Sequence, residues 1–187
     1  MRIVAGQFRS RRLHTPKNND IRPTSDKVKG AIFSSLGPKA SQGRFLDCYS
    51  GTGNMALEAI SRGCEFAVLV DASKQACSII KQNIQDLQVQ KQTQLIHKDI
   101  FAAIENIDQG FDCIYIDPPY AKEKNVQLME KLCAYHLINE DGVVVVESLA
   151  KQTFPDNVAD LEKTKEKTYR DTKITYYRKK ANYIKIK

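Results

Sequence analysis

The sequence predicts an α/β fold: a mostly parallel sheet with helices on both faces and an antiparallel hairpin at its C-terminal edge. From residue 44 onward, short apolar runs alternate with helical patterns, which is typical of buried parallel strands. After residue 160, two amphipathic segments around a polar turn replace that alternation and indicate a hairpin. The length of 187 residues suits one compact unit of this kind.

Seven strands and four helices are expected in the main domain, residues 41–187. The strands are predicted at 44–49, 65–71, 93–97, 111–117 and 143–147, with the hairpin at 161–170 and 173–179. The helices are predicted at 55–62, from Ser73 to about residue 87, at 100–107 and at 122–137. Ser73 can cap its helix, Gly63 can end the first one, and Asp141-Gly142 predicts a turn.

Residues 1–40 are expected to form a small basic extension that packs on the main domain. A short strand is predicted at 2–5 and a helix at 25–36, with Thr24 or Ser25 as its N-cap and Gly37-Pro38 as its stop.

The charge is unevenly distributed along the chain. Residues 1–44 carry ten Lys/Arg and two Asp/Glu, residues 45–150 carry eight and fifteen, and residues 151–187 carry eleven and five. Basic flanks suit a polyanion such as RNA, although a lysine-rich solvated surface explains the C-terminal stretch equally well. Arginine suits phosphate contacts, so Arg9, Arg11, Arg12 and Arg22 are candidate RNA-binding residues. Thr24, in the segment R-P-T with Arg22, is included with them.

Composition points to a cytoplasmic protein without a structural metal. No run approaches the roughly 18 apolar residues of a membrane span, and the N-terminus lacks the apolar core of a secretory signal. The five cysteines are widely spaced, form no C-x-x-C pair and fall mostly in apolar runs, which is typical of reduced core residues.

A ligand site is predicted at the carboxyl ends of the strands, where α/β sheets bind their ligands. An acid stands at or just beyond the end of each of the first four main-domain strands: Asp47, Asp71, Asp99 and Asp117. The loop S-G-T-G-N follows the first strand, and its glycines allow a ligand to approach the backbone closely. Asp71 lies twenty residues beyond Gly51, a spacing that suits a contact to ribose hydroxyls, whereas Asp71 and Asp99 could instead be helix caps.

The ligand favoured by this loop is S-adenosylmethionine. A dinucleotide site would continue the glycine series, but Asn54-Met55-Ala56 follows Gly53. The acid that opens D-C-Y-S-G-T-G would repel a pyrophosphate and attract an ammonium or a sulfonium. The predicted cofactor-binding residues are Asp47, Ser50, Gly51, Thr52, Gly53, Asn54, Asp71, Asp99 and Asp117.

The segment D-P-P-Y, residues 117–120, predicts a site for a planar amine. Its prolines cannot continue a central strand, so the strand ends in a rigid turn. The Asp117 carboxylate and the Pro118 carbonyl can accept the two hydrogens of an NH₂ group, which directs the nitrogen lone pair out of plane, and Tyr120 can stack on a base. The predicted catalytic residues are Asp117, Pro118, Pro119 and Tyr120; a plain strand-to-loop turn is the alternative.

Taken together, these motifs resemble the bacterial RsmD family of 16S rRNA guanine-N2 methyltransferases. The resemblance spans D-C-Y-S-G-T-G-N-M-A-L-E-A-I-S-R-G, V-L-V-D, D-P-P-Y and the opening R-I-V-A-G…R-R-L…I-R-P-T-S-D-K-V-K-G-A-I-F. It implies a class I (Rossmann-like) methyltransferase fold, S-adenosylmethionine as donor, and a guanine of the small ribosomal subunit or its assembly intermediate as target. By position, it implies that Asp47, Gly51 and Gly53 line the methionine part of the donor, Asp71 the ribose and Asp99 the adenine.

The sequence departs from the family pattern at a few positions. Ala56 replaces a usual glycine, and Lys27, Lys29 and Gly30 stand where the family often has Arg, Arg and Glu. Three other hypotheses remain: an adenine-amino DNA methyltransferase, for which no target-recognition domain is visible; a non-catalytic RNA-binding assembly factor; and a protein glutamine methyltransferase.

Overall fold

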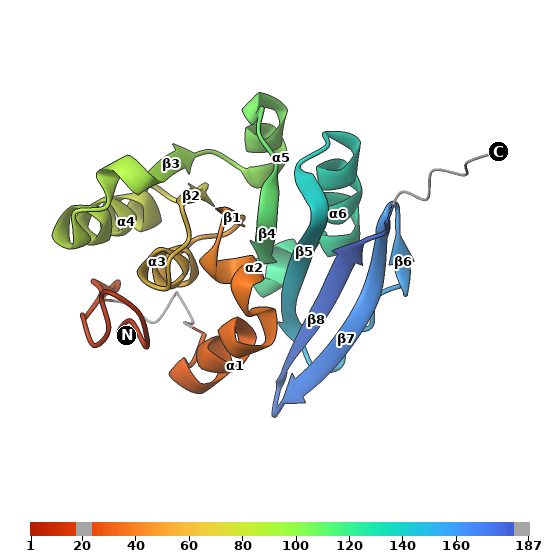
Figure 1. Cartoon of the computed structure of the whole chain (residues 1–187), viewed down its shortest axis with the longest axis horizontal. Coiled ribbons are helices and arrows are strands. Elements are labelled where there is room, and N and C mark those ends of the chain that lie inside the picture. The colour runs from red at the N-terminus through yellow and green to blue at the C-terminus, as the bar shows by residue number, and fades with distance from the viewer. Residues whose placement is uncertain (18–23, 182–187) are drawn as a thin grey trace.

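The computed structural model describes residues 1–17 and 24–181 and contains one eight-stranded sheet in the order β3-β2-β1-β4-β5-β8-β7-β6 (Figure 1). The first five strands are mutually parallel, and β8, β7 and β6 continue the sheet antiparallel. The strands are β1 Arg44–Asp47, β2 Phe66–Asp71, β3 Thr93–His97, β4 Phe111–Ile116, β5 Ile138–Leu149, β6 Asn157–Val158, β7 Leu161–Tyr169 and β8 Thr172–Lys179.

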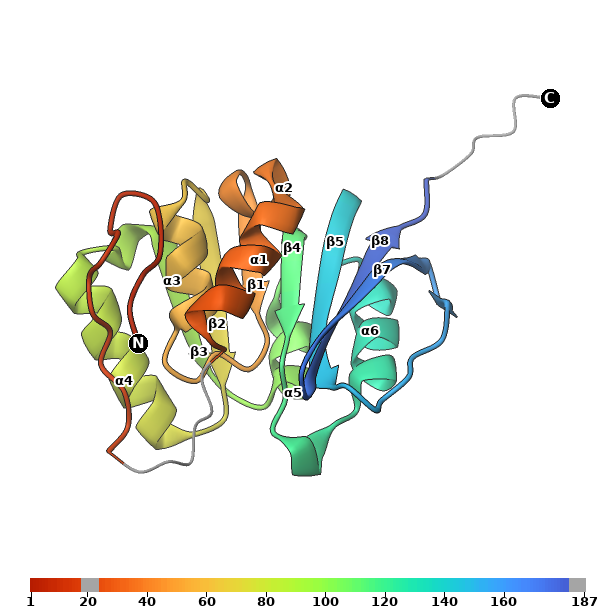
Figure 2. The same ribbon diagram turned by 90° about the horizontal axis from the view of Figure 1, so that it is seen from below.

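Helices cover both faces of this sheet (Figure 2). The helices are α1 Asp26–Leu36, α2 Pro38–Ser41, α3 Asn54–Ser61, α4 Lys74–Leu87, α5 Ile100–Ala103 and α6 Asn125–Ala134. Successive residues of a strand face opposite sides, so Phe45 packs with α1, α3 and α4, while Leu46 packs with α5 and α6. The near-continuous apolar runs of the central strands therefore belong to two separate cores.

The strand order places a crevice at the carboxyl ends of β1 and β4. From β1 the chain moves outward to β2 and β3, then returns to build β4 and β5 on the other side. The loops that follow β1 and β4 therefore leave the sheet in opposite directions, which is the switch point where open α/β sheets bind ligands.

The predicted fold class is confirmed, with several corrections to its elements. The segment at 2–5 is not a strand; it contributes only an isolated bridge between Arg2 and Arg12. The helix predicted at 122–137 is shorter, because a 3₁₀ turn at Tyr120–Lys122 precedes α6. The helix predicted at 100–107 divides into α5 and a 3₁₀ turn at Ile104–Asn106, and β6 is an eighth strand.

The fifth main-domain strand and the hairpin turn also differ from the prediction. β5 begins at Ile138 and not at 143, because the predicted Asp141-Gly142 turn lies inside it as an irregularity, with Asp141 at φ 60°. The hairpin turn falls on Arg170-Asp171, one residue earlier than expected, with Arg170 at φ 54°.

The N-terminal segment is fixed to α3 by a buried ion pair. Lys29 and Glu58 are both 0% exposed, and Lys29 Nζ lies 3.0 Å from Glu58 Oε1. The Glu58 carboxylate also accepts the backbone N–H groups of Val4 and Ala5, at 2.8 and 3.1 Å. The Lys29 ammonium donates to the Arg2 carbonyl at 2.8 Å, so both charges are satisfied by the extension that they hold in place.

The helix caps and the cysteines agree with the predictions from the sequence. Ser25 and Ser73 cap α1 and α4, each accepting a backbone N–H through its hydroxyl. All five cysteines are free thiols, and four of them are buried. No helix within residues 1–17 and 24–181 is long and apolar enough to cross a membrane.

Candidate active site

The loop after β1 has the backbone geometry of a ligand-binding turn. Gly51 and Gly53 adopt φ values of 61° and 84°, in the left-handed region that favours glycine. A Cβ at Gly53 would also meet Leu57 Cδ1 at 3.1 Å and Leu69 Cδ2 at 3.2 Å. Glycine at position 53 is therefore needed for the turn and for the close packing of α3 on β2.

Asp71, at the end of β2, holds this loop from the side. Its Oδ2 accepts the Gly51 N–H at 2.9 Å, and its Oδ1 accepts the Ser73 N–H at 2.8 Å. Each carboxylate oxygen keeps a further lone pair, so Asp71 can still accept ribose hydroxyls. The helix cap is Ser73 and not Asp71, so the capping interpretation of Asp71 is wrong; Asp71 fixes the backbone on both sides and faces the glycine loop.

Asp47, the last residue of β1, carries an almost fully buried carboxyl group, with the residue only 1% exposed. Its Oδ2 accepts the Ser50 hydroxyl at 3.0 Å, while its Oδ1 is buried without a hydrogen-bond partner in the described part of the chain. Burial raises the pKa of Asp47 to about 7. A buried acceptor that lacks a donor is costly, so this atom fits a bound molecule that brings a cationic N–H, such as the ammonium of S-adenosylmethionine.

Three other predicted cofactor residues have partners elsewhere. The Thr52 hydroxyl donates to Met1 Sδ at 3.1 Å, and the Asn54 amide oxygen accepts the Lys29 ammonium at 2.7 Å, so both side chains contact the N-terminal segment or its anchor. Asp99 caps α5 by accepting the Phe101 N–H at 2.9 Å, as the capping alternative predicted.

Asp117 lies at the end of β4 beside a second acid, Glu147, which ends the buried core of β5. Ile116 pairs with Val146 in parallel register, so the residues that follow each of them stand side by side. The two carboxyl groups are therefore neighbours on adjacent strands. Burial, the adjacent Glu147 and the charge of Asp47 together raise the pKa of Asp117 well above its usual range.

Two hydroxyl groups fix Glu147 in place. Its Oε2 accepts the hydroxyl of Tyr115, from β4, and the hydroxyl of Thr24 at 2.8 Å. Thr24 is the last residue before the N-cap of α1, so it links the N-terminal extension directly to the D-P-P-Y site. Sequence reasoning missed Glu147 and Tyr115, although the run V-V-V-V-E-S carried the same signal as the other strand-end acids.

A small hollow opens beside Glu147 and next to Pro118, the residue after Asp117; Asp117 itself is not among the residues that line it. Tyr120 is 58% exposed at its rim. Pro118 and Glu147 face the same hollow, which is lined by Pro118, Tyr120, Glu123, Glu147, Ser148, Leu149 and Gln152. An aromatic ring, a rigid proline turn and an acidic edge are the groups that a flat, hydrogen-bonding ligand requires.

The N-terminal arginines are not brought together with Asp117. The Phe8 N–H donates to Ser61 Oγ, and the Arg11 guanidinium donates to the Asp86 carbonyl, both at the last turns of helices. Because α3 and α4 run back from the carboxyl ends of the strands, these two contacts lie at the opposite end of the sheet, where the exposed Arg9 also lies. The exposed Arg12 instead bridges to Arg2, which pairs with Asp26 at the start of α1. Arg22 lies outside the described residues.

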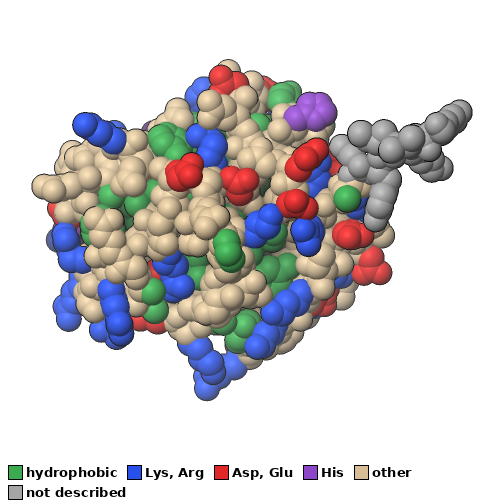
Figure 3. All heavy atoms as spheres, in the orientation of Figure 1, with side chains coloured by type: hydrophobic (Ala, Val, Ile, Leu, Met, Phe, Trp, Pro, Cys, Tyr) green, Lys and Arg blue, Asp and Glu red, His purple; other side chains and the backbone are tan. Residues whose placement is uncertain are grey.

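Basic groups do reach the carboxyl ends of the parallel strands through the β7–β8 hairpin. Thr172 pairs with Leu149, the last residue of β5, so the exposed Arg170 at the hairpin tip lies at the same edge as Glu147. In Figure 3, lysine and arginine side chains gather along the lower rim, where Figure 1 places the tip of the β7–β8 hairpin.

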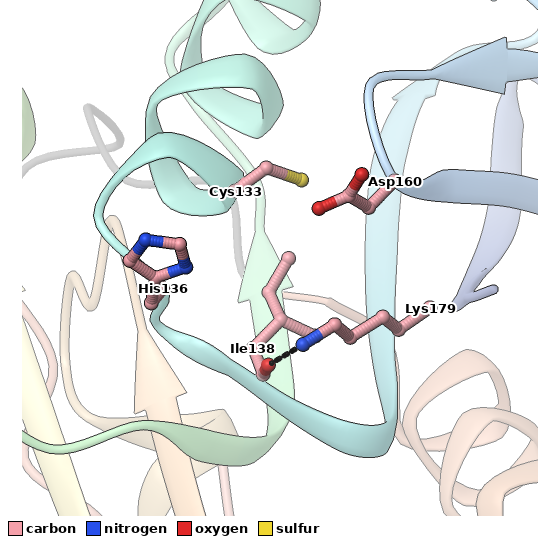
Figure 4. Close-up of a pocket in the computed structure, with 5 residues that line it drawn as sticks. All are labelled: Cys133, His136, Ile138, Asp160 and Lys179. Carbon is pink, nitrogen blue, oxygen red and sulfur yellow. Dashed lines mark hydrogen bonds between the residues drawn. The ribbon is translucent and has the colours of Figure 1, made fainter. Parts of the chain in front are cut away.

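A second hollow lies far from these residues. It is formed by Cys133, His136, Ile138, Asp160 and Lys179, and Lys179 Nζ donates to the Ile138 carbonyl at 3.2 Å (Figure 4). It sits at the amino end of β5, at the edge opposite Asp117. Burial raises the pKa of the Cys133 thiol, which disfavours the nucleophilic thiolate, so this hollow is not an active-site candidate.

Known proteins match the chain over nearly its full length. The family model described as "Conserved hypothetical protein 95" matches residues 1–178. The protein YlbH of Bacillus subtilis (strain 168), which carries an rRNA methyltransferase name, is 34% identical over 184 residues, covering 97% of this chain and 100% of YlbH. Ribosomal RNA small subunit methyltransferase D of Haemophilus influenzae is 30% identical over 152 residues, covering 79% and 78%.

Solved structures confirm the fold. A Streptococcus pyogenes structure titled as a conserved hypothetical protein is 38% identical, with a TM-score of 0.78, and covers 82% of this chain and 96% of that one. More distant neighbours, 13–14% identical, include a SAM-dependent methyltransferase and an O-methyltransferase in complex with SAH. The fold is therefore that of the S-adenosylmethionine-dependent methyltransferases, as the sequence predicted. By its match to the family model and to these relatives, the chain belongs to the RsmD family of methyltransferases.

Proposed function

We propose that the protein transfers a methyl group from S-adenosylmethionine to the exocyclic N2 amino group of a specific guanine in 16S rRNA. The observation that carries this proposal is the position of Asp117-Pro118-Pro119-Tyr120 at the end of β4, next to β1 and its glycine loop. The names of the relatives support rRNA of the small subunit as the substrate class.

The residues at the end of β4 prepare the amine. A nucleobase NH₂ is a weak nucleophile because its lone pair is delocalised into the ring. Asp117 and the Pro118 carbonyl accept its two hydrogens and hold the nitrogen with its lone pair out of plane, while Tyr120 stacks on the base at roughly 1–3 kcal/mol. A base must leave its stack to enter such a hollow.

The donor side is formed by the loop after β1. Asp47 would take the ammonium of the methionine part on its unpaired Oδ1, and Asp71 would accept the ribose hydroxyls. When bound, the donor supplies a sulfonium methyl group: the N–C bond forms as the S–C bond breaks, and the sulfur keeps that electron pair. The methylated nitrogen then loses one proton, and the Glu147 carboxylate, which lines the same hollow beside Asp117, is placed to take it.

The RNA contacts divide between the two edges of the sheet. Thr24 at the active site and Arg170 at the hairpin tip are placed for the RNA around the target base. Arg9 and Arg11 would contact phosphates farther away, because they lie at the opposite end of the sheet, and Arg12 would add a phosphate contact beside Arg2. A folded rRNA or an assembling particle is large enough to reach both.

The decisive variant is Asp117→Ala. We expect it to bind S-adenosylmethionine normally in calorimetry but to lose at least about 100-fold in methyl transfer to small-subunit particles, because the amine is no longer held. Asp108→Ala removes an exposed carboxylate elsewhere and should behave as wild type. Near-normal turnover by Asp117→Ala would refute the assigned role.

The remaining hypotheses give different results in the same assays. An adenine-amino DNA methyltransferase would label DNA and leave the particles unlabelled. A non-catalytic assembly factor would bind the particles but fail to bind S-adenosylmethionine, although the intact loop with Gly51, Gly53 and Asp47 argues against this. A protein glutamine methyltransferase would leave label in protein after ribonuclease treatment.

A further inference from the structure

The D-P-P-Y motif does not by itself distinguish the amino group of guanine from that of adenine. Both bases present a planar NH₂ to Asp117 and a flat ring to Tyr120. They differ at the neighbouring ring nitrogen: N1 of guanine carries a hydrogen and donates, whereas N1 of adenine accepts. A selective site therefore needs a group beside Asp117 that recognises a donor and rejects an acceptor.

Glu147 occupies that position. It follows Val146 as Asp117 follows Ile116, so the two acids stand side by side on adjacent parallel strands, whose backbones are about 4.8 Å apart. Glu147 lines the same hollow as Pro118 and Tyr120. A base stacked on Tyr120 with its amine at Asp117 would therefore present its N1 edge toward Glu147.

The surroundings of Glu147 favour its use as a fixed acceptor. Tyr115 and Thr24 both donate to Oε2, which holds the carboxylate and leaves Oε1 as the remaining acceptor. Two half-buried acids side by side repel one another, and such pairs are typical of functional sites.

We propose that Glu147 is the specificity-determining residue that accepts N1–H of guanine and excludes adenine. This inference rests on the proposed function, because it assumes that a guanine amine is the group held by Asp117. The N1–H of guanine satisfies the Oε1 acceptor of the Glu147 carboxylate, whereas the lone pair of adenine N1 would face that oxygen and leave both atoms without a donor. Thr24 is a positioning residue, acting through Glu147.

The test compares a guanine and an adenine at the same site. After the target is mapped with wild-type enzyme, small-subunit particles are reconstituted from transcribed 16S rRNA that carries either G or A there, and methyl transfer to each is measured. Glu147→Gln is nearly isosteric, and its amide can donate to adenine N1. Glu140→Gln, an exposed position at the far end of β5, makes the same charge change and serves as the control.

We expect wild type and Glu140→Gln to methylate the G particles much faster than the A particles. Glu147→Gln should lose about 10–100-fold in methyl transfer to the G particles, and its G:A ratio of rates should fall by at least about 10-fold. Thr24→Val should lower the G:A ratio of methyl transfer by a smaller factor than Glu147→Gln does, with unchanged S-adenosylmethionine binding. An unchanged ratio in a Glu147→Gln enzyme that folds and binds the donor overturns this inference alone. A wild-type reaction that methylates no guanine overturns the proposed function and this inference with it.

Discussion

Replacing Asp47 with asparagine should change how the stability of the protein depends on pH. The folded-state pKa of Asp47 is about 7, against 3.8 for an unperturbed aspartate, because the carboxyl group is buried. A group whose pKa is raised on folding binds its proton more tightly in the folded state. Its ionisation therefore destabilises the fold increasingly as pH rises from about 4 through about 7.

The magnitude follows from the size of the pKa shift. Each pKa unit corresponds to about 1.4 kcal/mol, so the full effect approaches about 4 kcal/mol well above pH 7. Between pH 5 and pH 8, integration over the two pKa values gives roughly 3 kcal/mol. The asparagine side chain cannot ionise, so the free energy of unfolding of Asp47→Asn, minus that of wild type, should rise by this amount across the interval.

Urea unfolding at pH 5, 6, 7 and 8, without cofactor, measures this difference. Any constant cost of burying the amide NH₂ cancels, because only the change with pH is compared. Asp108→Asn, at an exposed site, should run parallel to wild type. Parallel curves for wild type and Asp47→Asn would refute the buried-carboxyl account, and S-adenosylmethionine binding that is not weakened in Asp47→Asn would remove the ammonium contact from the proposal.

Two further predictions concern the ion pair that holds the N-terminal extension and the arginines proposed to contact RNA. Glu58→Gln leaves the buried Lys29 ammonium without a counter-ion and should lower the free energy of unfolding by about 3–5 kcal/mol, measured in urea. Lys29→Met should cost less, because Arg62 and two backbone N–H groups still satisfy Glu58; equal losses would contradict this reading. Replacing Arg9, Arg11 and Arg12 together by glutamine should flatten the slope of log affinity against log salt for RNA by about 2–3, and Arg170→Gln by about 1. An unchanged salt dependence of RNA affinity in the triple variant would count against phosphate contacts by these three arginines.

Local signals in the sequence were sufficient for most of the fold. The alternation of apolar runs with capped helices places β3 at residues 93–97 and α4 up to Leu87, because those signals act within a few residues. The start of β5 was missed, because Asp141-Gly142 is a turn signal that pairing with β4 and β8 overrides. The brief β6 has no periodic pattern from which it could be read.

The candidate site, too, was predictable from the sequence only where its signals are local. The acids at strand ends and the glycine loop are local features, and the sequence sufficed to collect them at one edge. Lys29 was assigned no role, because its partner Glu58 lies 29 residues further along the chain and their pairing depends on how the extension packs. The contacts of Thr52 and Asn54 with Met1 and Lys29 could not be predicted for the same reason.

The most direct test of the central claim is the identity of the methylated nucleoside. Small-subunit particles from a strain that lacks the protein are incubated with it and with isotopically labelled S-adenosylmethionine, and the digested rRNA is analysed by mass spectrometry. The label should appear in N2-methylguanosine, at one position, and be absent with Asp117→Ala. Label in N6-methyladenosine, or in no nucleoside, would contradict the claim that Asp117 and Pro118 hold a guanine amine.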